Sequence, residues 1–182
     1  MNYHKTKISD VIICEPEIFE DSRGYFFESF SQDRFEKFIG YNVNFCQENE
    51  SKSNIGILRG LHFQKPPFAQ AKLVRVTKGK VLDVVVDLRN NSSTFGQHLT
   101  VELCSRNKKQ LFIPRGFAHG FISLEKNTIF SYKVDNYYSP KHDCGIIYND
   151  NTLDINWGNN KFIISNKDLS LPNFDKNKEY FK

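Results

Sequence analysis

Residues 72–89, KLVRVTKGKVLDVVVDLR, decide the fold that the sequence predicts. From Lys72 to Thr77 the side chains fall into two alternating sets, which is the period-two pattern of a β-strand. The TKGK sequence at 77–80 predicts a hairpin turn, and a second alternating run follows it. In that run one face is entirely aliphatic, and the other mixes valines with Asp83, Asp87 and Arg89. We therefore expect two successive β-strands joined by a tight turn.

Further strand-like segments flank this stretch. They are LTVELCS (99–105), KQLFIP (109–114), GFAHGFISLE (116–125) and TIFSYKVDNYY (128–138), with a loop at NNSSTFG (90–96). Closer to the N-terminus, EDSRGYFFESF (20–30) combines turn residues with strand-like aromatics. Many short strands separated by turn signals indicate an antiparallel sandwich or barrel.

One helix is clear, at SQDRFEKFIG (31–40). Ser31 or Asp33 can cap its start, and Gly40 suits its end. The face predicted to pack in the core carries Phe35, Phe38 and Ile39. The polar segment after Asn149 is expected to be loop with one or two short helices. No repeat or linker divides the chain, so a single domain is expected over residues 1–182.

Composition and charge narrow the class of protein. The chain has 182 residues, of which 39% are hydrophobic and 25% charged, as in a globular domain with a sizeable core. The net charge of +4 is small and dispersed, which does not favour a nucleic-acid partner. No targeting or membrane segment is recognised. We expect a cytoplasmic protein without membrane contact, and neither a zinc site nor a disulfide from the widely spaced Cys14, Cys46, Cys104 and Cys144.

Two of the five histidines stand in strand-like segments beside glycine, His62 in GLHFQ and His119 in FAHGF. A single histidine in such a place is usually structural, but two of them favour a functional site. Neither belongs to a His-x-His pattern, because Gln64 and Phe121 stand two residues further on. Metal binding is therefore disfavoured. The histidines expected at the surface are His4, His98 and His142.

A proton-transfer site suits these histidines better. Histidine titrates near neutral pH and serves as a general base when a carboxylate orients it and stabilises the imidazolium. Tyr132 is a candidate acid, although its place in a strand pattern favours a half-buried structural aromatic. The residues leave the choice of carboxylate open among Asp83, Asp87, Asp143, Asp150 and Asp168.

A set of motifs in the chain resembles the pattern of a known family. In order along the chain they are DSRGYFFE, QENESKS, ILRGLHFQ, QAKLVRVTKGKVLDVVVDLRNNSSTFG, IPRGFAHGF, YKVDNYYSP, YND and SNKD. Together they resemble the dTDP-4-dehydrorhamnose 3,5-epimerase family, which acts on nucleotide 4-keto-6-deoxy sugars. The resemblance runs from about Ile8 to Pro172. It implies a mainly β protein, an antiparallel, cupin-like jelly-roll barrel with a few short peripheral helices.

The resemblance also implies roles for individual residues. His62 is the expected general base, Asp168 its carboxylate partner and Tyr132 the acid on the opposite face of the sugar. Lys72 is expected near the C4 oxygen, and Tyr138 is expected to stack on thymine. The positions that match substrate-binding positions of the family are Arg23, Glu28, Gln47, Glu48, Asn49, Arg59, His119, Tyr138, Asp143 and Lys167.

Two departures from the family pattern bear on the site. Asp143 stands where the family commonly has Glu, so its side chain reaches less far. Trp157–Gly158 stands where the family has Trp-Pro, which is expected to loosen the segment that carries Asp168.

The implied reaction inverts C3 and C5 of dTDP-4-keto-6-deoxy-D-glucose and yields dTDP-4-keto-L-rhamnose. It needs no cofactor and belongs to dTDP-rhamnose biosynthesis, which supplies lipopolysaccharide and capsule. The family resemblance also implies a homodimer, in which an N-terminal strand adds to the sheet of the other subunit.

Three alternatives remain open. An enzyme that inverts only C3 or only C5 of a related hexose or heptose would keep the same motifs. A non-catalytic sugar-nucleotide binding cupin is opposed by the presence of both His62 and Tyr132. A metal-dependent cupin dioxygenase is disfavoured by the missing ligand pattern.

Overall fold

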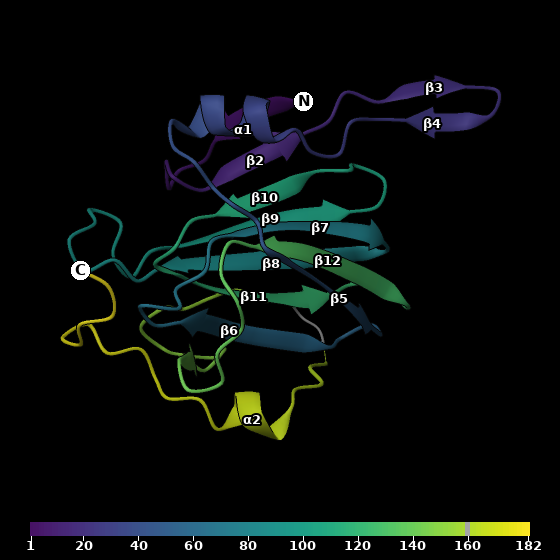
Figure 1. The fold of residues 1–182 in the computed structure, drawn as a ribbon. Coiled ribbons are helices and arrows are strands. Elements are labelled where there is room, and N and C mark those ends of the chain that lie inside the picture. The colour runs from purple at the N-terminus through teal and green to yellow at the C-terminus, as the bar shows by residue number, and fades with distance from the viewer. Residues whose placement is uncertain (159–160) are drawn as a thin grey trace.

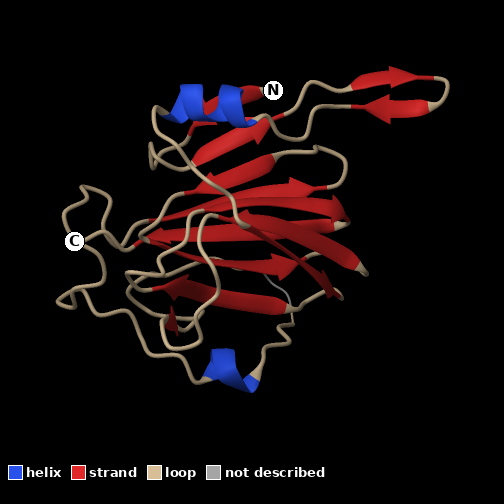
Figure 2. Cartoon of the chain, in the orientation of Figure 1, coloured by secondary structure: helices blue, strands red, loops and turns tan. Residues whose placement is uncertain are grey.

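Two antiparallel sheets packed face to face make up most of the computed structural model, which describes residues 1–158 and 161–182 (Figure 1). The first sheet has the order β1 (Asn2–Lys5), β2 (Ile12–Glu15), β10 (Gln110–Ile113), β7 (Lys72–Lys78), β12 (Thr128–Val134), β5 (Gln47–Ser53). The second has the order β13 (Asp143–Gly145), β6 (Leu58–Gln64), β11 (Phe117–Ser123), β8 (Lys80–Asp87), β9 (His98–Cys104). Figure 2 shows how strands dominate the body, with the helices at its periphery. The predicted mainly β jelly-roll class is confirmed.

The hairpin predicted at TKGK is wrong. Strands β7 and β8 follow one another with only Gly79 between them, yet they belong to different sheets. Strand β7 pairs with β10 and β12, whereas β8 pairs with β9 and β11. Val74 and Val76 of β7 pack against Val81 and Val85 of β8 in the space between the sheets. An alternating pattern looks the same whether two strands pair or face each other across a sandwich, so the sequence could not separate these cases.

Apolar side chains form three layers. Between the sheets lies a cluster that includes Val74, Val81, Leu103, Leu111, Phe121 and Phe130. The outer face of the second sheet is covered by the C-terminal segment, through residues such as Trp157, Phe174, Tyr180 and Phe181. Helix α1 (Gln32–Ile39) covers the outer face of the first sheet, where Phe35 meets Leu73 and Phe112. The functional chemistry must therefore find room within the layer between the sheets.

Helix α1 ends at Gly40 as predicted, and Ser31 is its N-cap residue, but the predicted capping hydrogen bond to the Ser31 side chain is not formed among the described residues. Gly40 adopts φ +85°, and its N–H donates to the Glu36 carbonyl at 2.8 Å. Phe35 is buried, but Phe38 is 40% exposed and stacks on Tyr3 of edge strand β1, so the core prediction is wrong for Phe38. The other helix, α2 (Asn166–Leu169), is a single turn. Neither helix of the described residues has the length and apolar character that crossing a membrane requires.

A hairpin of β3 (Phe19–Asp21) and β4 (Gly24–Phe26) projects away from both sheets (Figure 1). Its turn lies where the sequence predicted one. The side chains of Phe19, Tyr25 and Phe26 are 56%, 58% and 71% exposed. Three adjacent aromatic residues with that much contact with water mark a surface suited to a protein partner.

Strand β6 contains one more residue than the stretch of β11 that it pairs with. His62 pairs with His119, but Arg59 pairs with Phe121, so β6 advances one residue further over the same length. Gly60 makes this β-bulge possible, because it adopts φ +127° and a Cβ there would lie 2.5 Å from the Gly120 Cα. As a result Arg59 and His62, three residues apart, face the same cavity.

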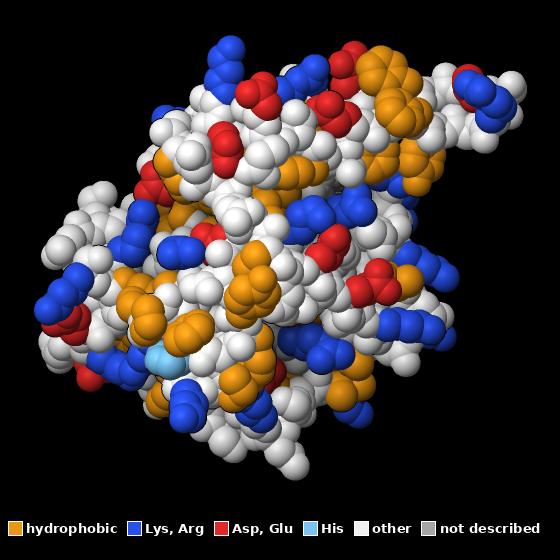
Figure 3. Space-filling view, in the orientation of Figure 1, with side chains coloured by type: hydrophobic (Ala, Val, Ile, Leu, Met, Phe, Trp, Pro, Cys, Tyr) orange, Lys and Arg blue, Asp and Glu red, His pale blue; other side chains and the backbone are white. Residues whose placement is uncertain are grey.

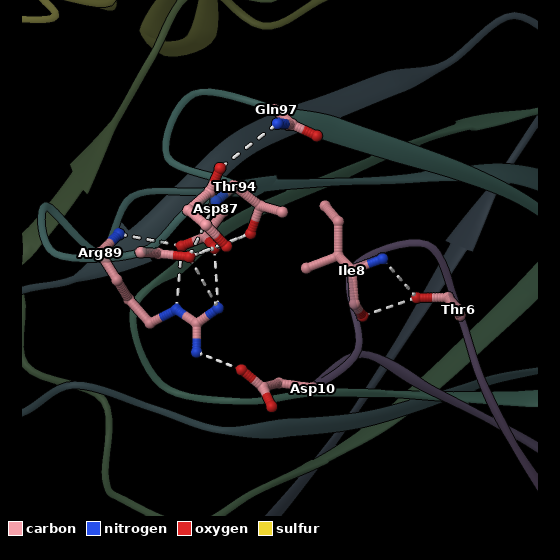
Figure 4. Close-up of polar contacts among 9 residues, drawn as sticks. Thr6, Ile8, Asp10, Asp87, Arg89, Thr94 and Gln97 are labelled. Carbon is pink, nitrogen blue, oxygen red and sulfur yellow. Dashed lines mark hydrogen bonds and ion pairs between the residues drawn. The ribbon is translucent and has the colours of Figure 1, made fainter.

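Asp87, at the end of β8, anchors a polar network at one end of the sandwich (Figure 4). The Arg89 guanidinium donates to both Asp87 oxygens at 2.9 and 2.7 Å and to Asp10 Oδ2 at 2.6 Å. The Ser92 and Thr94 hydroxyls also donate to Asp87. Burial opposes ionisation of Asp87, but these hydrogen bonds outweigh it and hold its pKa below the usual range. The network ties the N-terminal segment and the 90–96 loop to the second sheet.

Asp87→Asn should lower the free energy of unfolding at pH 7 by about 3 kcal/mol, because the half-buried Arg89 guanidinium loses its buried charged partner. A carboxyl with a lowered folded pKa stabilises the fold above its unfolded pKa of about 3.9, and this contribution is lost as the pH falls through the folded value. Urea unfolding should therefore show the difference between wild type and variant shrinking below about pH 4. Asp10→Asn, which touches the same guanidinium from the surface, should change stability little. Equal effects of the two variants would contradict this account.

Candidate active site

A cavity of about 550 Å³ lies between the two sheets, and a second of about 360 Å³ adjoins it. The residues that line both mark their junction: His62, Lys72, Tyr132 and Lys167. They come from β6, β7, β12 and α2, segments distant in the sequence. Asp168 also lines the larger cavity. The structure thus brings the four predicted catalytic residues, His62, Lys72, Tyr132 and Asp168, to one place.

Asp168 is the carboxylate that orients His62. His62 Nε2 lies 2.8 Å from Asp168 Oδ1, and the backbone N–H of Gly60 donates to Oδ2 at 3.1 Å. The Asp168 side chain is almost fully buried, whereas His62 is partly exposed to the cavity. Burial opposes ionisation of Asp168, but the bonds from His62 and Gly60 outweigh it and lower its pKa. An ionised partner can therefore support a positive charge on the imidazole.

Asp83 contacts His119 instead of His62. Its two oxygens lie 3.1 and 2.9 Å from His119 Nε2, and both side chains are buried. The His119 ring also stacks on Phe130 with ring centroids 6.0 Å apart. Burial lowers the pKa of His119 and raises the pKa of Asp83, so it disfavours the charged form of both side chains. The remaining candidates, Asp87 and Asp150, line neither cavity.

Asp143 lies in the smaller cavity and joins two other predicted binding residues. Its Oδ2 accepts a hydrogen bond from Lys167 Nζ at 2.6 Å and from the Tyr138 hydroxyl at 3.2 Å. Its ion pair raises the pKa of Lys167. The shorter side chain of Asp thus still reaches both partners. The backbone N–H of Tyr138 donates to Gln47 Oε1 at 3.4 Å, which adds β5 to this end of the site.

Tyr132 and His62 reach the cavity from opposite sheets, Tyr132 on β12 and His62 on β6. Tyr132 pairs in register with Asn49 of β5. Burial raises the pKa of Tyr132 despite a hydrogen bond with Asn49 and the positive charge of Arg59. The hydroxyl is therefore protonated at neutral pH and can donate a proton.

Lys72 approaches the same point from the start of β7. Burial lowers its pKa to about 8, although the negative charges of Asp83 and Asp143 act in the opposite direction. Lys72 is thus mostly cationic at pH 7, in a setting where its charge is poorly screened by water.

Sequence reasoning missed part of the cavity wall. Phe121 and Phe130, whose rings stack with centroids 4.2 Å apart, form an apolar floor. A signal for both existed, because they stand two residues from His119 and Tyr132 and period two places them on the same face. Other lining residues carried no such signal, among them Ile163 and Ile164.

Glu48 does not line either cavity. On β5 the side chains alternate, so Gln47 and Asn49 face the cavity while Glu48 faces away. Glu48 instead pairs with Lys133 Nζ at 2.8 Å. Contact of Glu48 with a ligand stays a prediction, since within one chain its side chain pairs with Lys133 instead of lining either cavity.

Arg23 and Glu28 also lie outside the cavities of their own chain. Arg23, at the tip of the β3–β4 hairpin, is held by Asp21, and its side chain is 88% exposed. Glu28 lies just after the hairpin, and its Oε1 is 3.3 Å from Arg34 Nη1. The hairpin projects from the body, so within one chain the expected contact with the site is not made (Figure 1).

Comparison with known proteins identifies the relationship. The sequence profile described as dTDP-4-dehydrorhamnose 3,5-epimerase matches residues 5–176. The chain belongs to the dTDP-4-dehydrorhamnose 3,5-epimerase family. The member of this family from Escherichia coli K12 is 50% identical over 177 residues, which cover 97% of this chain and 96% of that protein.

Solved structures of the family agree with this one in fold. The dTDP-4-dehydrorhamnose 3,5-epimerase from Elizabethkingia anophelis has a TM-score of 0.94 at 48% identity and covers 99% of both chains. The dTDP-6-deoxy-D-glucose-3,5-epimerase from Legionella pneumophila, solved with dTDP-4-keto-L-rhamnose, has a TM-score of 0.89 at 41% identity. It covers 96% of this chain and 98% of its own.

The departure from the family pattern at Trp157–Gly158 lies on the C-terminal segment. Trp157 is buried, and its Nε1 donates to the Tyr148 carbonyl at 2.8 Å. Gly158 adopts φ +79°, and its N–H donates to Asn156 Oδ1. The tryptophan is thus anchored, and the expected loosening of the segment stays a prediction.

Lys72 should titrate near pH 8 in the free protein, well below an ordinary lysine at about 10.4, because its charge is enclosed. The measurement is a ¹³C NMR titration of protein labelled at lysine Cε, with Lys72→Arg to assign the resonance. Asp83→Asn should move the midpoint lower still, since it removes a negative charge that favours the ammonium form. A midpoint above pH 10 would mean that the side chain is solvated.

Proposed function

We propose that the cavity inverts C3 and C5 of dTDP-4-keto-6-deoxy-D-glucose and gives dTDP-4-keto-L-rhamnose. One observation carries the proposal: the His62–Asp168 pair and Tyr132 reach the same cavity from opposite sheets, with Lys72 beside both. Inversion at a carbon next to a ketone needs a base on one face, an acid on the other and a cation at the ketone oxygen. Family membership supports the same reaction, because the relatives are named for it.

The first step is removal of a proton. The C4 ketone acidifies the hydrogens on C3 and C5, and the His62 imidazole accepts one of them. Asp168 remains ionised because its pKa is lowered, so it stabilises the imidazolium that forms and fixes the ring. General bases of this kind typically contribute about 10²–10⁴-fold to the rate.

The second requirement is a place for the negative charge. Deprotonation moves an electron pair to the C4 oxygen, and the ammonium of Lys72 stabilises the enolate that results. This charge appears only after the proton has left, so the interaction lowers the barrier rather than tightening substrate binding. A preorganised stabiliser in an enclosed site is typically worth about 3 kcal/mol.

Return of the proton from the other side completes the inversion. The Tyr132 hydroxyl donates to the carbon from the sheet opposite His62, and its raised pKa keeps it protonated until then. Only protons move between protein and sugar, with no net oxidation, so the proposed reaction requires neither a nicotinamide nor a metal. Within residues 1–158 and 161–182 no group of three or more His, Cys, Asp or Glu is arranged to hold a metal ion.

The smaller cavity is the proposed nucleotide end. Tyr138 is 54% exposed there and offers a ring to the thymine base, a contact worth roughly 0.5–1.5 kcal/mol beyond the area it buries. Lys167 lines both cavities, and Arg59 lines the larger one. These two cations are the proposed partners of the diphosphate, with Gln47, Asn49 and His119 as further contacts.

The active unit is proposed to be a homodimer. Arg23 and Glu28 match binding positions of the family but lie outside their own cavity, so a second copy must supply them if they act as the family pattern implies. The hairpin is suited to that task, because Figure 3 shows hydrophobic side chains along it and a cationic side chain at its tip. Phe19, Tyr25 and Phe26 would be covered by the partner.

The two halves of the reaction should separate in deuterium oxide. Tyr132→Phe keeps the ring but deletes the proton donor, so it should incorporate deuterium next to the ketone with retained configuration while inversion falls by about 10²–10⁴-fold. His62→Ala should lose both exchange and inversion. NMR of the recovered sugar reads label and stereochemistry at C3 and C5 separately. It therefore also distinguishes an enzyme that inverts both carbons from one that inverts a single carbon. Native inversion by Tyr132→Phe would remove Tyr132 from the mechanism.

Mixed dimers test the role of the hairpin. Arg23→Ala and His62→Ala should each be nearly inactive alone, but co-refolding them should restore activity. In a mixed dimer one cavity combines an intact His62 with Arg23 of the partner subunit, whereas a site that used its own Arg23 would never be complete. Matched mixing of Arg59→Ala with His62→Ala should restore nothing, because these two residues line the same cavity.

A further inference from the structure

The segment that carries Asp168, residues 163–174, is tied down at its start. The N–H of Ile163 donates to the Gly56 carbonyl at 2.8 Å, and the Ile163 carbonyl accepts from Leu58 N–H at 3.1 Å. These bonds form a parallel bridge between Ile57 and Ile163, just before β6. Asp168 follows five residues later on α2, whose single turn lacks the length to hold its own shape.

Ser165 fixes the backbone of Asp168. Its Oγ accepts a hydrogen bond from the Asp168 N–H at 3.1 Å, as an N-cap residue does. The other fixed point of Asp168 is its Oδ2, which accepts from Gly60 N–H. With main chain and carboxylate both held, Oδ1 is left directed at His62. The cap thus acts on the geometry of the catalytic pair.

Asp150 ties down the far end of the same segment. This side chain is 4% exposed, and its Oδ2 accepts from the Phe174 N–H at 2.8 Å. Its Oδ1 accepts from the N–H groups of Thr152 and Leu153, each at 2.9 Å. A buried carboxylate whose hydrogen bonds all come from backbone amides is a rigid anchor. Asp150 was one of the carboxylates that the sequence offered as a partner for His62, and it now has a different part.

We propose that Ser165 and Asp150 are positioning residues, which keep the Asp168 carboxylate on His62 by holding residues 163–174 at both sides. The inference rests on the proposed proton transfer by His62. Asp150 lines neither cavity. Ser165 lines the larger cavity, but its Oγ is engaged by the Asp168 amide. Small displacements of a catalytic group can cost about 10²-fold in rate, so the effect of these residues falls on turnover.

The experiment compares kcat, KM and the imidazole N–H signals of ¹⁵N-histidine-labelled protein. Ser165→Ala and Asp150→Asn should each lower kcat by about 10-fold or more while KM changes less than about 2-fold, because the substrate contacts remain. Ser165→Thr keeps a capping hydroxyl and should recover most of the lost kcat. Asp175→Asn is the matched control, because its Oδ1 accepts from Asn177 N–H in a similar but exposed turn of the same tail.

The imidazole N–H signals show whether a variant disturbs only the His62–Asp168 contact or loosens the whole fold. The N–H that bridges His62 and Asp168 should broaden or shift in Ser165→Ala and Asp150→Asn. The corresponding signal of the buried His119–Asp83 pair should stay in place as an internal reference. Native kcat in both variants, or equal loss of both histidine signals, would overturn the proposal. Asp168→Asn with native turnover would instead refute the proposed function and leave the anchoring contacts unaffected.

Discussion

The extra residue of β6 at Gly60 is the constraint on which the site depends. A regular strand would place Arg59 and His62 on opposite faces, because their spacing is odd. The bulge turns both toward the cavity, and the Gly60 N–H points at Asp168. Close approach of Gly120 on β11 leaves no room for a side chain at Gly60. One backbone irregularity therefore sets the direction of His62 and holds the Asp168 carboxylate.

Each carboxylate in or near the cavities has its own hydrogen-bond partner. Asp168 contacts the imidazole of His62, Asp83 contacts that of His119, and Asp143 accepts a hydrogen bond from Lys167. Asp87 and Asp150 serve the scaffold at its ends. Each is buried or half-buried and has hydrogen-bond donors. For Asp87 and Asp168 these donors outweigh the cost of burial and lower the pKa, whereas burial raises the pKa of Asp83. The ammonium of Lys72 has its charge opposed mainly by burial, which suits a group proposed to meet an enolate.

The residues that line the cavity come partly from sheet strands and partly from the C-terminal segment. The strands deliver His62, Lys72 and Tyr132 on fixed backbones, whereas Asp168 arrives on a C-terminal segment with little secondary structure. That segment depends on specific anchors rather than on a ladder of strand bonds. On the other side, the β3–β4 hairpin carries Arg23 away from its own cavity. The chain thus holds the groups of the proposed chemistry, and only Arg23 and Glu28 of the predicted binding residues named here are proposed to act in the cavity of a second copy.

The sequence by itself determined much of this protein. Period-two patterns around residues 72–89 and 116–138 indicated the strands, and residues at Asp21 and Gly40 marked a turn and a helix end. The motifs around His62, Tyr132 and Asp168 pointed to the family and to three groups that do come together. Local patterns and ordered motifs survive in sequence because they depend on residues close along the chain.

Only the tertiary structure decided which strands pair, and where the side chains point. The alternation of β7 and β8 was correct, yet their pairing as a hairpin was not, because sheet membership depends on contacts with β10, β11 and β12. The choice of Asp168 from the carboxylates that the residues left open needed a distance across more than a hundred positions, 2.8 Å to His62. Glu48 shows the same limit on a smaller scale, since its neighbours face the cavity and it does not. These outcomes depend on packing between distant segments, and no local pattern records it.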